Sequence, residues 1–167
     1  MRLITHALTA VVCHWIIWYG RILGWTVEEW HTVEQYSGTV KVERLFIGRY
    51  IQKILKKIVL PIPATVSVEL LRYAVGSGNE LHIDNIGPHH ADNGLINAEW
   101  IQTGVILLNN NFEGGALIFP KQNAVFDQTS RGDLIIFPAG PNSNEFAHTV
   151  STVTQGTRYS LVMRWSK

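Results

Sequence analysis

The chain has 167 residues, enough for one compact domain, and its composition of 46% apolar and 16% charged residues argues against extensive disorder. A net charge of +1 without a basic cluster argues against a nucleic-acid partner. Cys13 is the only cysteine, which excludes an internal disulfide and a multi-cysteine metal site. We therefore expect a cytoplasmic protein in a reducing compartment, with no membrane association.

The first sixty residues predict a helical region. Apolar residues recur at three- and four-residue steps between Thr9 and Gly24, which predicts an amphipathic helix with Thr9 as its N-cap and Gly24 as its C-terminal stop. Residues 26–38 have a mixed pattern and are expected to be mostly loop, followed by a strand over residues 39–46. Residues 49–59 have the spacing of a second amphipathic helix, which two prolines end.

From residue 64 onward the pattern changes to short β-type runs separated by Gly, Asn and Pro. The predicted strands cover residues 65–75, 81–84, 101–109, 116–119, 124–128, 133–137, 145–153 and 157–165. About eight strands without intervening helices predict an antiparallel jelly roll, a double-stranded β-helix of the cupin-like kind. The expected fold is mainly β with N-terminal helices, in one domain: residues 1–63 form a helical support region and residues 64–167 the jelly-roll core.

Two histidines and an aspartate form the most informative pattern. His82 and Asp84 are two residues apart, so in a strand their side chains share one face. His148 adds a second imidazole, which completes a ligand set used to hold Fe(II) with open positions. A His-x-Asp pair alone is weak evidence, and the same set is compatible with a zinc hydrolase.

Ten residues after His148, Arg158 supplies a permanent cation suited to gripping a carboxylate. The alternation of residues 158–165 predicts that Tyr159, Leu161, Met163 and Trp165 pack on one face. The opposite row, which contains Arg158, Ser160, Val162 and Arg164, would then face the cavity. A zinc hydrolase would leave Arg158 unexplained.

Three ordered segments carry a resemblance to a known family. They are residues 112–120 (FEGGALIFP), 132–137 (GDLIIF) and 148–160 (HTVSTVTQGTRYS), preceded by an N-terminal helix that contains Cys13. In these segments the chain resembles the prolyl 4-hydroxylase-like 2-oxoglutarate- and Fe(II)-dependent dioxygenases.

This resemblance implies roles for particular residues. His82, Asp84 and His148 would bind Fe(II) and form the catalytic centre. Arg158 would bind the distal carboxylate of 2-oxoglutarate, with Ser160 assisting. The remaining positions on the metal would take the other end of 2-oxoglutarate and O2, and ascorbate is an optional further cofactor.

Two further residues, Tyr73 and Thr103, would line the cosubstrate pocket according to the resemblance. The alternative for both is ordinary packing within the barrel. Two departures from the family pattern are Asn79 and Leu107, which stand where relatives often have tyrosines. These departures bear on the detailed shape of the cosubstrate and substrate pocket.

The implied activity is hydroxylation of an unactivated C–H bond, with release of succinate and CO2. Family resemblance favours a peptidyl residue, proline first, as substrate; a free amino acid or other small molecule is the second alternative and nucleic-acid demethylation the third. A noncatalytic jelly-roll binding module is a different class that stays open. Residues 85–101 are expected to form a lid loop, in which His89 and His90 lie at the surface or contact substrate.

Overall fold

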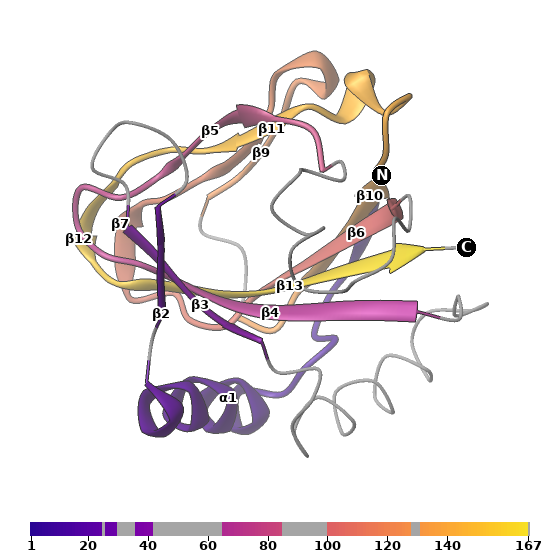
Figure 1. The fold of residues 1–167 in the computed structure, drawn as a ribbon. Coiled ribbons are helices and arrows are strands. Elements are labelled where there is room, and N and C mark those ends of the chain that lie inside the picture. The colour runs from indigo at the N-terminus through magenta and orange to yellow at the C-terminus, as the bar shows by residue number, and fades with distance from the viewer. Residues whose placement is uncertain (25, 30–35, 42–64, 85–99, 128–130, 167) are drawn as a thin grey trace.

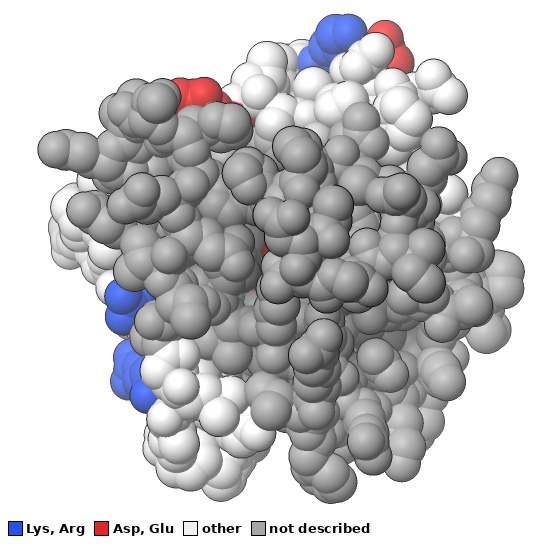
Figure 2. Space-filling model, in the orientation of Figure 1, with Lys and Arg blue, Asp and Glu red and all other residues white. Residues whose placement is uncertain are grey.

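The computed structural model describes residues 1–24, 26–29, 36–41, 65–84, 100–127 and 131–166. The predicted helix over residues 49–59 lies outside the described residues, as do His89, His90 and most of the predicted lid loop. Within the described part, no helix combines the length and the apolar character needed to cross a membrane. Figure 2 shows one face of the molecule, on which the described charged side chains lie in a few small groups.

Two antiparallel sheets face each other and dominate the molecule (Figure 1). The larger sheet has the order β1-β10-β6-β13-β4-β3-β2. Its strands are β1 (Arg2–Ile4), β2 (Thr26–Glu29), β3 (Tyr36–Lys41), β4 (Thr65–Tyr73), β6 (Trp100–Leu107), β10 (Leu134–Pro138) and β13 (Arg158–Ser166). Every adjacent pair in this sheet is antiparallel.

The smaller sheet has the order β5-β11-β8-β9, and a separate two-stranded ribbon joins β12 to β7. These strands are β5 (Asn79–His82), β7 (Phe112–Gly114), β8 (Leu117–Phe119), β9 (Ala124–Phe126), β11 (His148–Val150) and β12 (Val153–Gly156). Two short 3-10 helices, η2 (Pro120–Gln122) and η3 (Asn144–Phe146), complete the described elements. The predicted jelly roll is confirmed by this antiparallel arrangement of two facing sheets.

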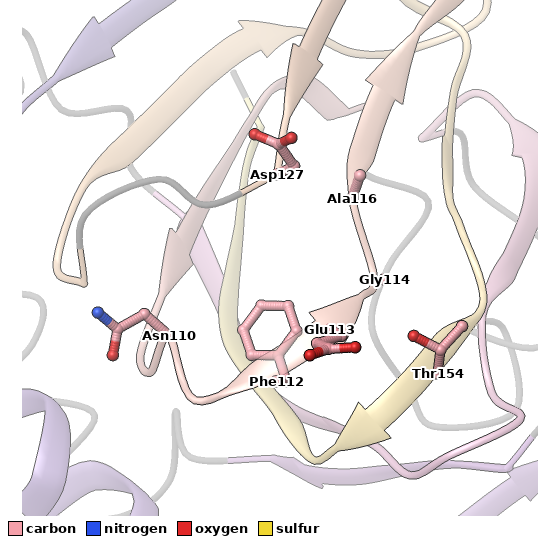
Figure 3. A pocket seen from close by; sticks show the side chains of 7 residues that line it. All are labelled: Asn110, Phe112, Glu113, Gly114, Ala116, Asp127 and Thr154. Atoms are coloured by element: carbon pink, nitrogen blue, oxygen red, sulfur yellow. The ribbon is translucent and has the colours of Figure 1, made fainter.

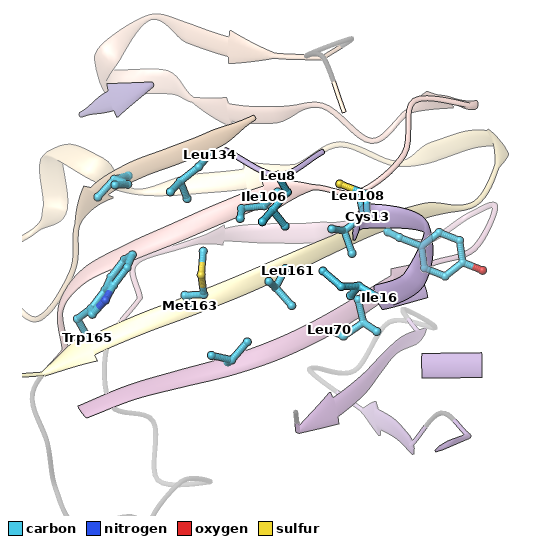
Figure 4. Close-up of a cluster of buried hydrophobic side chains, with 13 residues drawn as sticks. Leu8, Cys13, Ile16, Leu70, Ile106, Leu108, Leu134, Leu161, Met163 and Trp165 are labelled. Carbon is cyan, nitrogen blue, oxygen red and sulfur yellow. The ribbon is translucent and has the colours of Figure 1, made fainter. Parts of the chain in front are cut away.

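Helix α1 (Ala10–Leu23) covers the outer face of the larger sheet. The Thr9 side chain accepts a hydrogen bond from the Val12 backbone N–H, and Gly24 ends the helix at a φ of 79°, so both predicted boundaries are confirmed. The helix buries Cys13 and Ile16 against a cluster of apolar side chains from β4, β6, β10 and β13 (Figure 4). Burial in this cluster fixes where the helix docks.

Strand β13 separates two apolar cores, as its alternating pattern predicts. Leu161, Met163 and Trp165 belong to the outer cluster beneath α1. Val162 belongs to the inner cluster, where Phe119 and Phe137 pack between the two sheets. Side chains of the same row as Val162 therefore point between the sheets.

Several elements differ from the sequence-based expectation. Strands β2 and β3 lie where residues 26–38 were expected to be mostly loop, and β1 and β7 were not predicted. The predicted strand over residues 145–153 is divided into η3, β11 and the start of β12. Strand β5 ends at His82, so Asp84 lies two residues beyond it. Such short strands depend on a pairing partner elsewhere in the chain rather than on their own pattern.

Candidate functional site

Strands β5 and β11 bring the two predicted histidines together. His82 and His148 are directly opposite each other in the antiparallel pairing, with ring centroids 4.4 Å apart. Asp84 follows β5, and its Oδ1 lies 3.8 Å from His82 Nε2 while its Oδ2 lies 3.8 Å from His148 Nε2. One ligand atom from each residue lies within 4.8 Å of the other two. The structure thus brings together the three residues of the predicted donor set.

Both imidazole rings are held through the nitrogen that faces away from Asp84. His82 Nδ1 lies 2.8 Å from the carbonyl oxygen of Glu80, and His148 Nδ1 lies 3.1 Å from that of Phe146. A carbonyl oxygen only accepts, so Nδ1 carries the proton in both rings, and in the neutral form each Nε2 has a free lone pair. This outer contact is typical of histidines that bind metals.

The electrostatics of the donor set suit a metal ion. Burial lowers the pKa of His148 to about 4 despite the opposing effect of Asp84, so His148 is neutral at pH 7. Burial alone would raise the pKa of Asp84, but the charge of Arg164, followed by His148 and His82, outweighs it and lowers the pKa to about 2. A neutral imidazole and an ionised carboxylate are the forms that bind a divalent cation, so the donor set fits such an ion.

Arg158 is a buried cation at the start of β13, with only 3% of its surface exposed. Its Nη1 donates to Ser160 Oγ at 3.0 Å, and its guanidinium carbon lies 5.0 Å from the centre of the Tyr73 ring. Among the described residues, no carboxylate forms an ion pair with Arg158, and its Nε has no hydrogen-bond partner. A buried guanidinium of this kind lacks a counter-ion.

The main chain near Arg158 is shaped to admit its side chain. Gly115 has a φ of 61°, and a Cβ at this position would lie 2.9 Å from Arg158 Cδ and 3.2 Å from the Phe112 ring. Any larger residue would push against the arginine stem. The glycine in the FEGGALIFP segment therefore has a specific role beside the buried cation.

Two further residues of the predicted site, Tyr73 and Thr103, are both buried, at 3% and 0% exposure. Tyr73 lies opposite Arg158 across β4 and β13, and burial raises its pKa, while the charges of Arg158 and Asp84 act on it in opposite directions. Thr103 lies on β6, and its buried hydroxyl is near Asp84 but has no hydrogen-bond partner among the described residues. Tyr73 is thus placed beside the cation, and Thr103 beside the donor set.

Outside the predicted set, Arg164 contacts Asp84 and is itself paired with Glu69. Arg164 donates from both Nε and Nη2 to Asp84 Oδ1, each at 3.3 Å, and from Nη1 to Glu69 Oε2 at 2.8 Å. Glu69 lies on β4 and is 7% exposed. The signal for Arg164 was its place in the inward-facing row of β13, because an arginine between two sheets requires an acidic partner. Glu69 gave no comparable signal.

A pocket of about 430 Å³ lies on the β7 side of Gly115 (Figure 3). It is lined by Asn110, Phe112, Glu113, Gly114, Ala116, Asp127 and Thr154. Figure 3 shows Glu113 and Asp127 on opposite sides of it. The predicted site residues do not line this pocket.

The sequence model of the 2OG-Fe(II) oxygenase superfamily matches residues 68–166, more than half of the chain. The chain belongs to this superfamily. It is therefore a 2-oxoglutarate-dependent dioxygenase, and Fe(II), 2-oxoglutarate and O2 are the cofactors that the family implies. The sequence-based assignment of family, enzyme class and these cofactors is confirmed, whereas ascorbate stays a prediction. No curated protein matches this oxygenase.

Solved structures share the fold of this oxygenase at low sequence identity. A collagen prolyl hydroxylase of Paramecium bursaria Chlorella virus-1, in its 2OG complex, is 18% identical with a TM-score of 0.69; the match covers 99% of this chain and 96% of that chain. A Pseudomonas putida prolyl-4-hydroxylase is 15% identical with a TM-score of 0.70, covering 99% and 91%. A Trichoplax adhaerens prolyl hydroxylase, in complex with a hypoxia inducible factor peptide fragment, is 15% identical with a TM-score of 0.74, covering 99% and 82%.

Proposed function

We propose that this oxygenase, as one domain over residues 1–167, hydroxylates a C–H bond of a peptidyl residue, with proline as the first candidate. His82, Asp84 and His148 would hold Fe(II), and Arg158 would bind the distal carboxylate of 2-oxoglutarate. The observation that carries this proposal is the buried Arg158 guanidinium, which has no acidic partner among the described residues. Burial lowers the pKa of Arg158, and an incoming carboxylate would offset that cost.

Each neighbouring side chain has a defined task in this proposal. Ser160 Oγ accepts a hydrogen bond from Arg158 Nη1, and the other N–H groups of the planar Arg158 guanidinium remain for a carboxylate. Tyr73 covers the guanidinium with its ring. Gly115 provides the space for the arginine stem. Fe(II), when bound, supplies the activation of O2 for C–H oxidation, coupled to conversion of 2-oxoglutarate to succinate and CO2.

A peptide is the favoured substrate because of the relatives. One structural neighbour was solved with a peptide fragment, and another is described as a collagen prolyl hydroxylase. A free amino acid or other small molecule is the alternative. The identity of the neighbours is below 20%, so an assay has to decide between these substrates.

The assay supplies the purified protein with Fe(II), 2-oxoglutarate and O2, with and without ascorbate, and either proline-containing peptides or a mixture of free amino acids. We expect a mass gain of one oxygen on a peptide, with one succinate formed per oxygen transferred. Modification of free metabolites alone would overturn the peptide assignment. Absence of 2-oxoglutarate turnover by the metal-loaded protein with every substrate would instead favour a noncatalytic binding module.

Replacement of Arg158 tests the carboxylate clamp. Arg158→Ala removes the cation, and we expect the KM for 2-oxoglutarate to rise about 30-fold or more, because loss of one partner of a buried charge pair costs roughly 2–5 kcal/mol. The Kd for Mn(II), measured by electron paramagnetic resonance, should change little. Lys121→Gln removes an exposed cation of the Lys121–Glu145 pair and serves as the control. An unchanged KM in Arg158→Ala would contradict the clamp.

A further inference from the structure

Three buried charges form one connected group behind the donor set. Arg164 lies between Glu69 and Asp84, and the three side chains are 14%, 9% and 5% exposed. Arg164 and Glu69 come from the adjacent strands β13 and β4 of the larger sheet, whereas Asp84 follows β5 of the smaller sheet. The guanidinium therefore connects the two sheets directly at Asp84.

The contacts of Arg164 distinguish the two oxygens of Asp84. Its Nε and Nη2 both point to Oδ1, at 3.3 Å each, while its Nη1 is used by Glu69 at 2.8 Å. Oδ2 of Asp84 has no such contact from Arg164 and lies 3.8 Å from His148 Nε2. Each carboxylate oxygen lies 3.8 Å from an imidazole Nε2 of the donor set, Oδ1 from His82 and Oδ2 from His148, but only Oδ1 accepts hydrogen bonds from Arg164.

We propose that Arg164, held in place by Glu69, is a positioning residue that engages Oδ1 of Asp84 and leaves Oδ2 as the single oxygen available to the metal. This inference rests on the proposed metal site. A carboxylate can bind a metal through one oxygen or through both. If Asp84 used both, it would take a position needed by 2-oxoglutarate or O2, so the arginine fork keeps that position open.

Glu69 has a separate task, which is to balance charge. A guanidinium that close to Asp84 is a fixed positive charge near a divalent cation, and the two repel each other. The ion pair with Glu69 offsets this charge while it fixes the direction of the fork. In Glu69→Gln the amide oxygen can still accept from Arg164 Nη1 but the negative charge is lost, so this change should weaken metal binding without releasing Oδ1, whereas loss of Arg164 should release Oδ1.

The test compares variants by the absorption spectrum of bound Co(II), the Kd for Mn(II) and the Kd of 2-oxoglutarate for the Co(II)-loaded protein. For Arg164→Gln we expect an altered Co(II) spectrum and tenfold or weaker 2-oxoglutarate binding, because Asp84 then competes for its position. Arg164→Lys should not restore the spectrum, because an ammonium lacks the two-donor fork.

The variant Glu69→Gln separates the effect of the Glu69 charge from the effect of the position of Arg164. We expect it to keep the wild-type Co(II) spectrum and to raise the Kd for Mn(II) several-fold, because Arg164 still holds Oδ1 but is no longer neutralised. The exposed ion pair of Lys121 and Glu145 offers matched controls. Lys121→Gln and Glu145→Gln each remove one charge of the same sign from an exposed side chain, and both variants should leave all three readouts unchanged.

Several results would overturn the inference. A folded Arg164→Gln protein with the wild-type Co(II) spectrum and 2-oxoglutarate affinity would do so, as would full recovery of the spectrum in Arg164→Lys. Circular dichroism of the metal-free proteins shows which variants fold. If Arg164→Gln does not fold, Arg164→Lys and the double variant Glu69→Gln/Arg164→Met decide by the same criteria. Wild-type protein that binds neither Mn(II) nor Co(II) would overturn the proposed function itself.

Discussion

Each side chain of the donor set is fixed through an atom that a metal would not use. The two histidines are held at Nδ1 by backbone carbonyls of Glu80 and Phe146, and Asp84 is held at Oδ1 by Arg164. One ligand atom of each residue lies within 4.8 Å of the other two, and in our proposal these atoms are the two Nε2 and Oδ2. Because these side chains already have restricted rotation, they lose less conformational entropy when a metal binds.

The lowered pKa of His148 makes the metal-free protein sensitive to acid. In the unfolded chain a histidine has a pKa near 6.5, and in the folded protein the pKa of His148 is about 4. The unfolded state therefore binds a proton first as the pH falls, and stability decreases from about pH 6.5 to pH 4. We expect a loss of about 2 kcal/mol in the free energy of unfolding between pH 7 and pH 5.

Urea titrations in the presence of a chelator measure this effect. His148→Gln should remove most of the pH dependence, whereas His14→Gln, at an exposed position of α1, should not. Asp84 adds a further loss only below about pH 4, because its pKa is lowered to about 2. The same slope in the His148→Gln protein would assign the pH dependence to other groups.

At the residue scale, the sequence identified those site residues whose chemistry and spacing are distinctive. His82 and Asp84 were paired by their two-residue spacing, although Asp84 turned out to lie beyond the strand. Arg164 was placed in the inward row, but its link to Asp84 spans 80 positions and depends on the packing of two sheets. No local pattern encodes such a contact, so the link from Glu69 through Arg164 to Asp84 emerges only from the structure.

At the scale of elements, helix α1 and the larger sheet share one apolar cluster, and Ile16 is 1% exposed within it. Ile16→Ala should lower the free energy of unfolding by roughly 2–5 kcal/mol, because it leaves a cavity between the helix and the sheet. Val11→Ala changes an exposed position of the same helix, and its effect should stay within about 0.5 kcal/mol. Urea unfolding at pH 7.5 checks both; similar effects of the two variants would contradict the observed docking.

Elements were predictable to the extent that they carry their own signals. Helix α1 has an N-cap, a stop and a clear period, and β13 has a nine-residue alternation, so both were placed correctly. Strand β1 has three residues and no pattern of its own; it exists because its backbone pairs with β10. The assignment of residues 26–38 as mostly loop was wrong for a similar reason, since β2 and β3 pair with each other and extend the larger sheet from β4.

At the scale of the whole molecule, the proposed site is divided between the two sheets. Strands β5 and β11 of the smaller sheet carry the histidines, and β13 of the larger sheet carries Arg158 and Arg164. A metal with 2-oxoglutarate bound to it would connect the donor set on one sheet to Arg158 on the other. Ligand binding should therefore stabilise the sandwich as a unit.

Thermal unfolding measures this connection. Mn(II) at about one hundred times its Kd should add roughly 2.7 kcal/mol, or about 5–10 °C in Tm for a chain of this size. Addition of 2-oxoglutarate should raise the Tm further in the presence of Mn(II), and this second increment should be absent from Arg158→Ala. A second increment in Arg158→Ala equal to that of the wild type would place 2-oxoglutarate elsewhere.

Strand β1 has a consequence for how the protein should be handled. It forms one border of the larger sheet, where Arg2, Leu3 and Ile4 cover the hydrogen-bonding groups of Ile136, Ile135 and Leu134 in β10. Shortening the chain by these few residues would uncover an apolar strand with free backbone donors and acceptors, which is a template for self-association. A truncation that removes β1 should therefore lead to oligomers and precipitation, even though β1 carries no residue of the proposed site.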